Sequence, residues 1–226
     1  MSKKKIVTLA LVAVIAVTAI ASASIAYFTD TKTAKNAFTM GNVKIALDEA
    51  PVNEEGHAID GDRVTANEYG IKAVYPGATL DKDPTIHNTG KNPAYIRAVV
   101  TVENGMNWLG LYNENVWTAP QEDAFNALIK DSLGEGWELA DIAYVKNADR
   151  GTTDFVATLK YTRILAAGTD TAPIFSEISF PAKLTENDVT TRVSQDGKFR
   201  IDVIAQAIQT NGFATWEAAF NAFDGN

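Results

Sequence analysis

The chain contains no cysteine and only two histidines among its 226 residues. Without cysteine, a disulfide framework, a thiol nucleophile and a thiolate metal site are all excluded. The two histidines, His57 and His87, lie far apart, one in an acidic loop and the other at the end of an expected strand. Zinc hydrolases place two histidines one helical turn apart with a glutamate between them, and this spacing is absent from the sequence. We therefore expect no catalytic residue, no metal site and no cofactor.

Basic clusters and phosphate-binding loops are also missing from the sequence. The formal net charge is −8, whereas proteins that bind nucleic acid need lysine and arginine patches that neutralise phosphates. No serine lies in a nucleophile elbow, and no glycine-rich loop precedes an expected helix. Nucleic acid is therefore excluded as a partner.

One long apolar run is present, at the N-terminus. Three lysines at positions 3–5 precede it, and it extends without a charge from Ile6 to about Ala26. A cationic start, an apolar run and small residues at its end are typical of a secretory signal peptide. The run is long enough for an uncleaved membrane anchor, which is the alternative interpretation. No second run of membrane length follows, so we expect membrane contact only through the uncleaved leader.

Cleavage of this leader is predicted after Ala26. Ser24 at position −3 and Ala26 at position −1 offer the small side chains that a signal peptidase needs, and Tyr27 becomes the new N-terminus. Cleavage after Ala23 is the alternative. Removing residues 1–26 takes away three lysines and no acid, so the formal net charge falls from −8 to −11. A secreted chain without cysteine is typical of a bacterial exterior, and we expect a secreted protein, extracellular or in a cell-surface matrix.

Residues 27–41 form a polar segment with alternating charges, which predicts a flexible N-terminal connector rather than core structure. From Val43 to Leu47 apolar and polar residues alternate, as in a half-buried strand. Residues 48–70 are acidic and rich in turn signals, which indicates a long loop. Residues 42–226 are long enough to bury a core as a single domain.

Alternating apolar and polar residues predict most of the remaining strands. The strongest pattern extends from Ala94 to Glu103, which we expect to pair with Pro84–Asn88 through a turn at Asn88–Pro93. Pro76-Gly77 has the signature of a type II turn, because glycine tolerates a positive φ. Further strands are expected within residues 71–80 and at 137–145, 154–164, 174–180 and 199–209.

Two short helices are expected among the strands. One extends over about 118–133, with Thr118 as its N-cap and Gly134 as its stop. The other extends over about 215–223, with Thr215 as its N-cap. About seven to nine strands with turns between them predict a mainly β fold, an antiparallel β-sandwich. Jelly-roll-like connectivity is one way to arrange such strands.

Two groups of residues are candidates for binding. Acidic pairs at positions 48/49, 54/55 and 60/62 could bind calcium, but the alternate spacing that ends in a bidentate glutamate is absent. A solvated acidic loop is therefore the preferred interpretation. Four aromatic residues could line a sugar platform, although packing in the core or at an interface is preferred. They are Trp108, Tyr112, Trp117 and Trp137.

Two motifs in the N-terminal half resemble those of a known family. The first consists of Ala26, Tyr27, Phe28, Thr29, Asp30, Phe38, Gly41, Val43 and Ile45. The second consists of Pro76, Gly77, Lys82, Asp83, Asn88 and Gly90. Together they resemble the TasA/camelysin family, whose members are exported through a SipW-type signal peptidase. The resemblance covers residues 1–103. The C-terminal part resembles the family only in having a long late strand.

The resemblance implies a jelly-roll-like sandwich that forms extracellular fibres in a biofilm matrix. The partners implied are further copies of the chain in a head-to-tail homopolymer, a SipW-type signal peptidase, and an anchoring or minor fibre protein. Camelysin-type members have been described as metalloproteases, so a secreted metalloprotease is an alternative, although no metal-ligand motif is present. A carbohydrate-binding surface module that uses Trp108, Trp117 and Trp137 is a further alternative.

These implications suggest a role for the segment that cleavage frees. An unpaired edge of a sandwich can accept an added strand from another chain. Insertion into the next subunit is a head-to-tail contact that does not close, and it therefore gives a filament. We expect a structural protein and not an enzyme. The candidate donor strand carries Tyr27, Phe28, Asp30, Phe38 and Met40.

Overall fold

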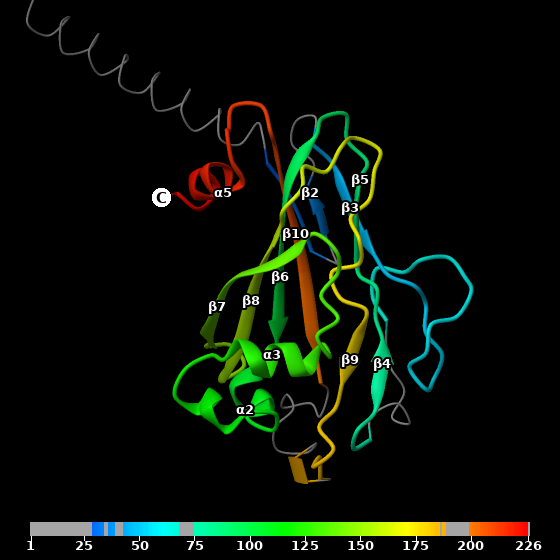
Figure 1. Ribbon diagram of the computed structural model, residues 1–226, viewed down its shortest axis with the longest axis vertical. Coiled ribbons are helices and arrows are strands. Elements are labelled where there is room, and N and C mark those ends of the chain that lie inside the picture. Colours follow the sequence, from blue (N-terminus) through cyan, green and yellow to red (C-terminus); the bar gives the residue numbers. More distant parts are fainter. Residues whose placement is uncertain are drawn as a thin grey trace, which may run out of the picture.

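Antiparallel strands in two layers make up most of the structure (Figure 1). The computed structural model describes residues 29–33, 36–38, 43–67, 75–185, 187–188 and 199–225. The predicted signal peptide with its cleavage residues Ser24 and Ala26, together with Tyr27, Phe28 and Met40, lies outside the described residues. Among the described residues, none of the helices has the length and apolar composition that crossing a membrane requires.

The first layer is a six-stranded sheet, which we call the large sheet. Its strand order is β2-β1-β10-β6-β8-β7, and every neighbouring pair is antiparallel. In that order the strands are Asn36–Phe38, Thr29–Thr33, Ile201–Gln209, Ala94–Val102, Thr152–Tyr161 and Trp137–Asn147.

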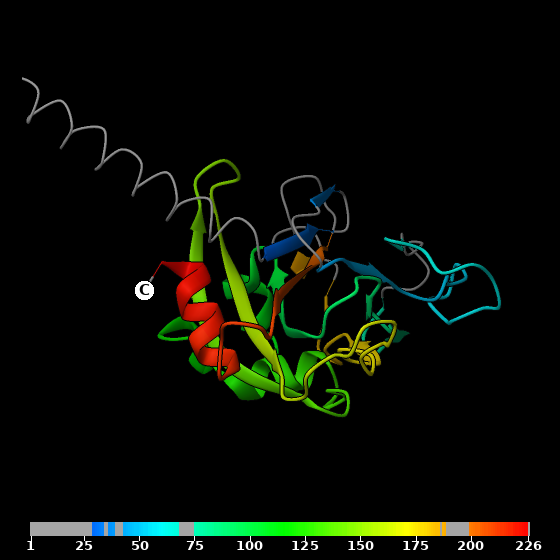
Figure 2. The same cartoon turned by 90° about the horizontal axis from the view of Figure 1, so that it is seen from above.

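The second layer consists of two small sheets that lie against one face of the large sheet (Figures 1 and 2). In one, β3 (Ile45–Asp48) pairs with β5 (Thr85–Asn88). In the other, β4 (Thr79–Asp81) pairs with β9 (Glu177–Ser179). The predicted fold class, mainly β with antiparallel sheets and a few short helices, is confirmed, and jelly-roll connectivity stays a prediction.

A single main core lies between the two layers, and strand periodicity explains it. On β6 the alternate residues Ile96, Ala98, Val100 and Val102, which share one face of the strand, are all 0% exposed. Their neighbours on β8, from Phe155 to Leu159, alternate in the same way, and Ile45 and Ile86 of the small sheets join the same cluster. The core is therefore built by residues from both layers.

The expected pairing of Pro84–Asn88 with Ala94–Glu103 is wrong. Both strands exist, but β5 pairs with β3 in a small sheet, whereas β6 pairs with β10 and β8 in the large sheet. Both edges of β6 are occupied, so no edge is left for β5. The turn at Asn88–Pro93 therefore carries the chain from one layer to the other.

The helix expected at about 118–133 is much shorter than predicted. It is α3, Glu122–Leu128, and Thr118 instead caps the C-terminus of the 3₁₀ helix η2, Glu114–Trp117. Pro120 explains the late start, because the residue before a proline avoids the α region. Lys130 and Asp131 explain the early end, because both have positive φ angles, 52° and 53°.

The other helices are short as well. A helix that the sequence did not indicate, α2, extends over Gly105–Leu109. The predicted C-terminal helix is confirmed as α5, Trp216–Asp224, and the Thr215 hydroxyl accepts a hydrogen bond from the Ala218 amide at 3.1 Å.

Replacing Phe155 with alanine should destabilise the fold strongly. Its side chain is 0% exposed, and its ring stacks on Phe125 at a centroid distance of 5.7 Å. Deleting a buried phenylalanine leaves a cavity and costs about 3–5 kcal/mol of unfolding free energy. Urea unfolding followed by tryptophan fluorescence measures this loss. The matched control is Val145→Ala on the neighbouring strand, where the side chain is 50% exposed and the expected change is within about 0.5 kcal/mol. Equal losses in the two variants would contradict this account of the core.

Candidate functional site

The first candidate site is the edge of the large sheet beside β10. Residues 27–41 were expected to be flexible, but the structure places residues 29–33 as β1 and 36–38 as β2. β1 pairs antiparallel with β10, from Thr29 opposite Ile208 to Thr33 opposite Ile204. The candidate donor residues Asp30 and Phe38 therefore lie in strands at this edge, and among the described strands β2 pairs with β1 alone.

The residues of β1 are polar, although β1 pairs with a strand that has buried apolar residues. Asp30 lies opposite Ala207 and Lys32 opposite Ala205, and both alanines are 0% exposed. Residues directly opposite each other in an antiparallel pair belong to the same face of the sheet. The strand TDTKT has no apolar residue to offer there. Main-chain pairing is therefore what β1 can contribute to the edge, and this pairing does not depend on which copy supplies the strand.

The opposite edge of the large sheet is formed by β7 and differs from the β10 edge. No described strand pairs with its outer side. The register with β8 shifts between Leu139 and Asp141, which marks a β-bulge. Glu138, Asp141 and Lys146 are exposed along the same strand. Bulges and charges are the features that stop edge strands from pairing with other chains. The large sheet therefore has one protected edge and one edge covered by a short polar strand.

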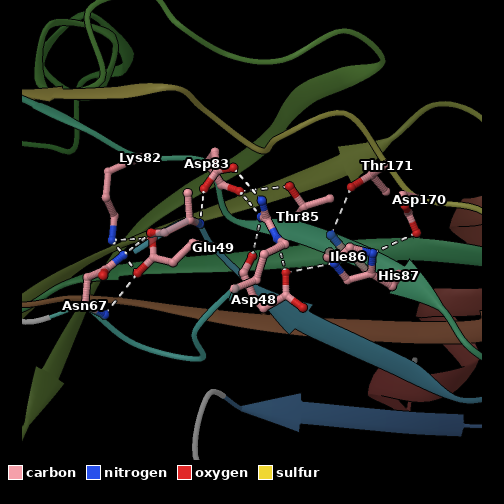
Figure 3. A network of polar contacts seen from close by, with 12 residues as sticks. Asp48, Glu49, Asn67, Lys82, Asp83, Thr85, Ile86, His87, Asp170 and Thr171 are labelled. Carbon is pink, nitrogen blue, oxygen red and sulfur yellow. Dashed lines mark hydrogen bonds and ion pairs between the residues drawn. The ribbon is translucent and has the colours of Figure 1, made fainter. Parts of the chain in front are cut away.

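The second candidate site is a polar network around the second family motif (Figure 3). The motif begins with the predicted turn, in which Gly77 has a φ of 78° and the Ala78 amide donates to the Tyr75 carbonyl at 3.0 Å. After β4, Lys82 Nζ lies 2.6 Å from Glu49 Oε2. The next residue, Asp83, accepts a hydrogen bond from the Ala50 amide at 2.6 Å. Both side chains thus hold the loop that follows β3.

Arg63 and His87 extend this network across the loop. The Arg63 guanidinium donates to the carboxylates of Asp48 and Asp83, the latter at 2.7 Å, and to both backbone carbonyls. The His87 ring lies between two carboxylates, with Nε2 2.8 Å from Asp48 and Nδ1 2.7 Å from Asp170. The network therefore ties the 49–67 loop and the segment around Asp170 to β5.

The carboxylates determine the charge state of His87. Burial lowers the pKa of His87, but the hydrogen bonds to Asp48 and Asp170 and the charges of both acids outweigh it, and the net shift is upward. An imidazolium that donates from both nitrogens has no lone pair left for a metal ion. The other histidine, His57, has a side chain that is 62% exposed and lies 3.6 Å from Asp81.

The described residues do not fit a catalytic zinc ion. Zinc hydrolases use about three protein ligands, usually with neutral histidines. The part of the chain that the structure describes contains no group of three or more His, Asp or Glu residues that could hold a metal. The acidic pair at positions 48/49 is not the solvated loop that we expected, because Glu49 is only 7% exposed and is paired with Lys82. Asp48 is likewise bound to Arg63 and His87.

The remaining motif residues, Asn88 and Gly90, stabilise a turn, and most of the four candidate aromatic residues pack inside the fold. Asn88 donates to the carbonyls of Asn92 and Leu165 at 2.9 and 3.1 Å, and its oxygen accepts from the Gly90 amide at 3.0 Å. The motif therefore builds the turn between the layers.

Of the four aromatic residues, Trp108 and Trp137 are core residues, Tyr112 donates to the Ser179 carbonyl, and only Trp117, 40% exposed, reaches the surface. The preferred interpretation as packing residues is confirmed for Trp108 and Trp137.

Sequence reasoning missed Arg63 and Asp170 as members of the network. Asp170 is 83 positions from His87, and no local pattern marks it as a partner. Arg63 lies in a loop whose acidic composition suggested only solvation. The contacts arise from the packing of loops against β5.

These features define the class of the protein as an antiparallel two-layer β protein with one sheet edge covered by its N-terminal strand. In a comparison with known families, residues 1–92 match the family model of the camelysin metallo-endopeptidases. The predicted resemblance to the TasA/camelysin family is thereby confirmed. The match includes both motifs and ends in the turn between β5 and β6. Searches of the curated proteins and of the solved structures gave no match.

His87 should make stability depend on pH in a defined direction. Because its pKa is higher in the folded protein than the value of about 6.5 in an unfolded chain, its stabilising effect is complete below about pH 6.5. The effect is lost as the pH rises through the raised folded value. We therefore expect the difference in unfolding free energy between the wild type and His87→Gln to be largest at about pH 6 and to shrink above it.

Urea unfolding at a series of pH values measures this difference, and subtracting the variant removes the contribution of the other titrating groups. His57→Gln is the matched control, because His57 is exposed and lies outside the network. A difference for His87→Gln that stays constant from about pH 6 to pH 9 would contradict the assignment of the charge on His87.

Proposed function

We propose that the protein is a secreted subunit of extracellular fibres in a biofilm matrix, and that its processed N-terminal strand links one copy to the next. The position of β1 is the observation that carries this proposal. β1 begins three residues after the predicted cleavage site, and it fills the edge of the large sheet beside β10. Donor-strand assembly requires a strand at a processed terminus that can pair with the sheet edge of another copy.

If β1 were exchanged between copies, each β10 would pair with a strand identical to its own β1. The β1 of a neighbour offers β10 the same main-chain donors and acceptors in the same register as the chain's own β1. Swapping an identical element is a low-cost route to association. Since the donor strand and the acceptor edge are different surfaces of each copy, the contact is head-to-tail, and it extends into a filament when it does not close into a ring.

The two edges of the large sheet support growth in one direction. The β7 edge is blunted by its bulge and by exposed charges, so strand addition there is disfavoured. The β10 edge remains as the acceptor. The uncleaved leader would hold the donor end in the membrane, so that a signal peptidase, proposed here to be of the SipW type, starts assembly. An anchoring or minor fibre protein would supply the first acceptor in the same way.

A secreted metallo-endopeptidase is the second candidate function. The name of the matched family favours it. The chemistry of the histidines counts against it, because both ring nitrogens of His87 face carboxylates and His57 lies on an exposed loop.

Deleting Tyr27–Lys35 from the processed protein should give a folded monomer that forms no filaments. The core residues that the structure describes, from Val43 to Ala207, lie outside the deleted segment, so the fold should persist while the donor strand is lost. Electron microscopy and sedimentation of the processed protein at increasing concentration measure assembly, and circular dichroism measures folding.

A matched pair of substitutions provides the control for this deletion. Thr31→Pro removes a main-chain donor in the middle of β1 and should reduce filament formation strongly, whereas Thr31→Val keeps the strand and should assemble normally. Filaments formed by the deletion variant would refute donor-strand assembly.

The processed wild-type protein should not cleave casein, with or without added zinc. This expectation follows from the position of His87, whose two ring nitrogens both face carboxylates. The assay compares the wild type, the wild type with a chelator, and His87→Gln, with thermolysin as the positive control. Cleavage by the wild type that both the chelator and His87→Gln abolish would replace the structural proposal by the protease.

A further inference from the structure

We propose that α5 and the turn before it form a docking platform for Tyr27 of a neighbouring copy, the first residue that processing exposes. This inference rests on the proposed function, since it assigns the place where the incoming donor strand ends. The platform consists of Tyr95, Phe213, Trp216 and Phe223 around the buried residues Ile208, Ala219 and Phe220.

The platform lies on the outer face of the large sheet. Figures 1 and 2 show α5 outside the large sheet, on the side away from the small sheets. Ile208 is 1% exposed beneath this cluster, and it is the residue of β10 that pairs with Thr29 of β1. The rim residues Phe213, Trp216 and Phe223 are only partly buried. Apolar aromatic surface therefore remains at the end of β10 where β1 begins.

Both ends of α5 are fixed to the sheet. Near its end, Asp224 accepts two hydrogen bonds from Arg97 of β6 at 2.7 and 2.8 Å, and the same guanidinium lies 4.4 Å from the centroid of Phe220. At its start, the Trp216 indole donates to the Ile96 carbonyl at 2.7 Å. A bidentate charged pair and a stacked guanidinium hold a helix in a single position. The platform is therefore formed before a strand arrives.

The register of β1 brings Tyr27 to this platform. The described register ends with Thr29 opposite Ile208. In an antiparallel pair, each step back along β1 is a step forward along β10, so an incoming strand that continued this register by two residues would bring Tyr27 opposite Thr210. Residues two apart lie on the same face of a strand, so in an incoming strand extended in this way Tyr27 would share the face of Ile208, which α5 covers. Thr210 begins the turn in which the Phe213 amide donates to its carbonyl at 3.1 Å. An incoming Tyr27 thus lies beside Phe213.

Tyrosine suits this position chemically. Its ring can pack on partly exposed aromatic side chains, while its hydroxyl and the new α-amino group stay in water. In the unprocessed chain, residue 26 and the leader continue from this point and would have to pass the turn at 210–213. The platform can therefore distinguish a free, processed terminus from a continuous chain. The occupant in the filament is the Tyr27 of the second copy, because that copy supplies the strand beside β10.

Cross-linking between single-cysteine variants tests the inference, since the natural chain has no cysteine. Processed Tyr27→Cys and Phe213→Cys proteins are mixed in equal amounts at a concentration above the raised assembly threshold that loss of the Tyr27 ring is expected to cause, treated with a short bis-maleimide and analysed by mass spectrometry. We expect a Tyr27–Phe213 cross-link between copies. Tyr27→Cys mixed with Val145→Cys, on the opposite edge of the large sheet, is the control and should give at most a trace of cross-linked dimer.

A second mixture separates this inference from the proposed function. Thr33→Cys and Ile204→Cys lie opposite each other in the β1–β10 register, so they report strand exchange alone. A Thr33–Ile204 cross-link between copies without the Tyr27–Phe213 cross-link would overturn the platform and leave donor-strand assembly standing. Absence of both cross-links between copies would overturn both.

The contribution of the ring is measured with Tyr27→Ala and Tyr27→Phe in the processed protein. Tyr27→Ala should raise the concentration needed for filament formation by about tenfold or more, because aromatic packing on the platform is lost. Tyr27→Phe keeps the ring and should assemble within about twofold of the wild type. An unchanged threshold for Tyr27→Ala would contradict the inference.

Discussion

The antiparallel pairing of β10 is the constraint on which the rest of the structure depends. On one side β10 is bonded to β6 over nine successive residue pairs, from Ile201 to Gln209, and this register places Ala205 and Ala207 in the core. On its other side it presents main-chain groups that have to be covered. The chain covers them with β1, a strand that has no apolar residue. A strand that is paired along its whole length on one side is therefore covered on the other side by a strand without apolar residues, and assembly is proposed at that junction.

The two motifs that carry the family resemblance have different roles in this arrangement. Lys82, Asp83 and Asn88 of the second motif hold the 49–67 loop and the turn between the layers, and none of them lies at the β10 edge. The first motif contains Asp30 and Phe38, which lie in the edge strands themselves. The second motif thus maintains the scaffold, while the first contributes to the edge strand whose exchange between copies we propose. The charges of Lys82 and Asp83 in the second motif are paired with other residues of the fold.

Local signals were predicted well from the sequence, and distant contacts were not. The alternation in Ala94–Val102, the positive φ of Gly77 and the cap at Thr215 each depend on a few neighbouring residues, and the structure contains all three. The pairing of β5 with β3 depended on β10 and β8 occupying both edges of β6, which no local pattern records. In the candidate site, Lys82 and Asp83 were identified, but the environment of His87 was not, because Asp170 reaches it only through the fold. The polar sequence of β1 indicated flexibility, and main-chain pairing with β10 overrode that preference.

The charge distribution is consistent with assembly through a strand rather than through a surface. After removal of residues 1–26 the chain carries a formal net charge of −11, and bodies of like charge repel each other over roughly a Debye length of about 8 Å at physiological ionic strength. β1 contains one acid and one base, Asp30 and Lys32, so the linking strand itself has no net charge. Its main-chain hydrogen bonds are neutral, and they form within the sheet of the acceptor. Repulsion between the acidic bodies therefore disfavours face-to-face aggregation, whereas insertion of a neutral strand at the β10 edge meets little of it. An acidic body with a connector that carries no net negative charge thus favours one specific contact among the many that a β-rich protein could make.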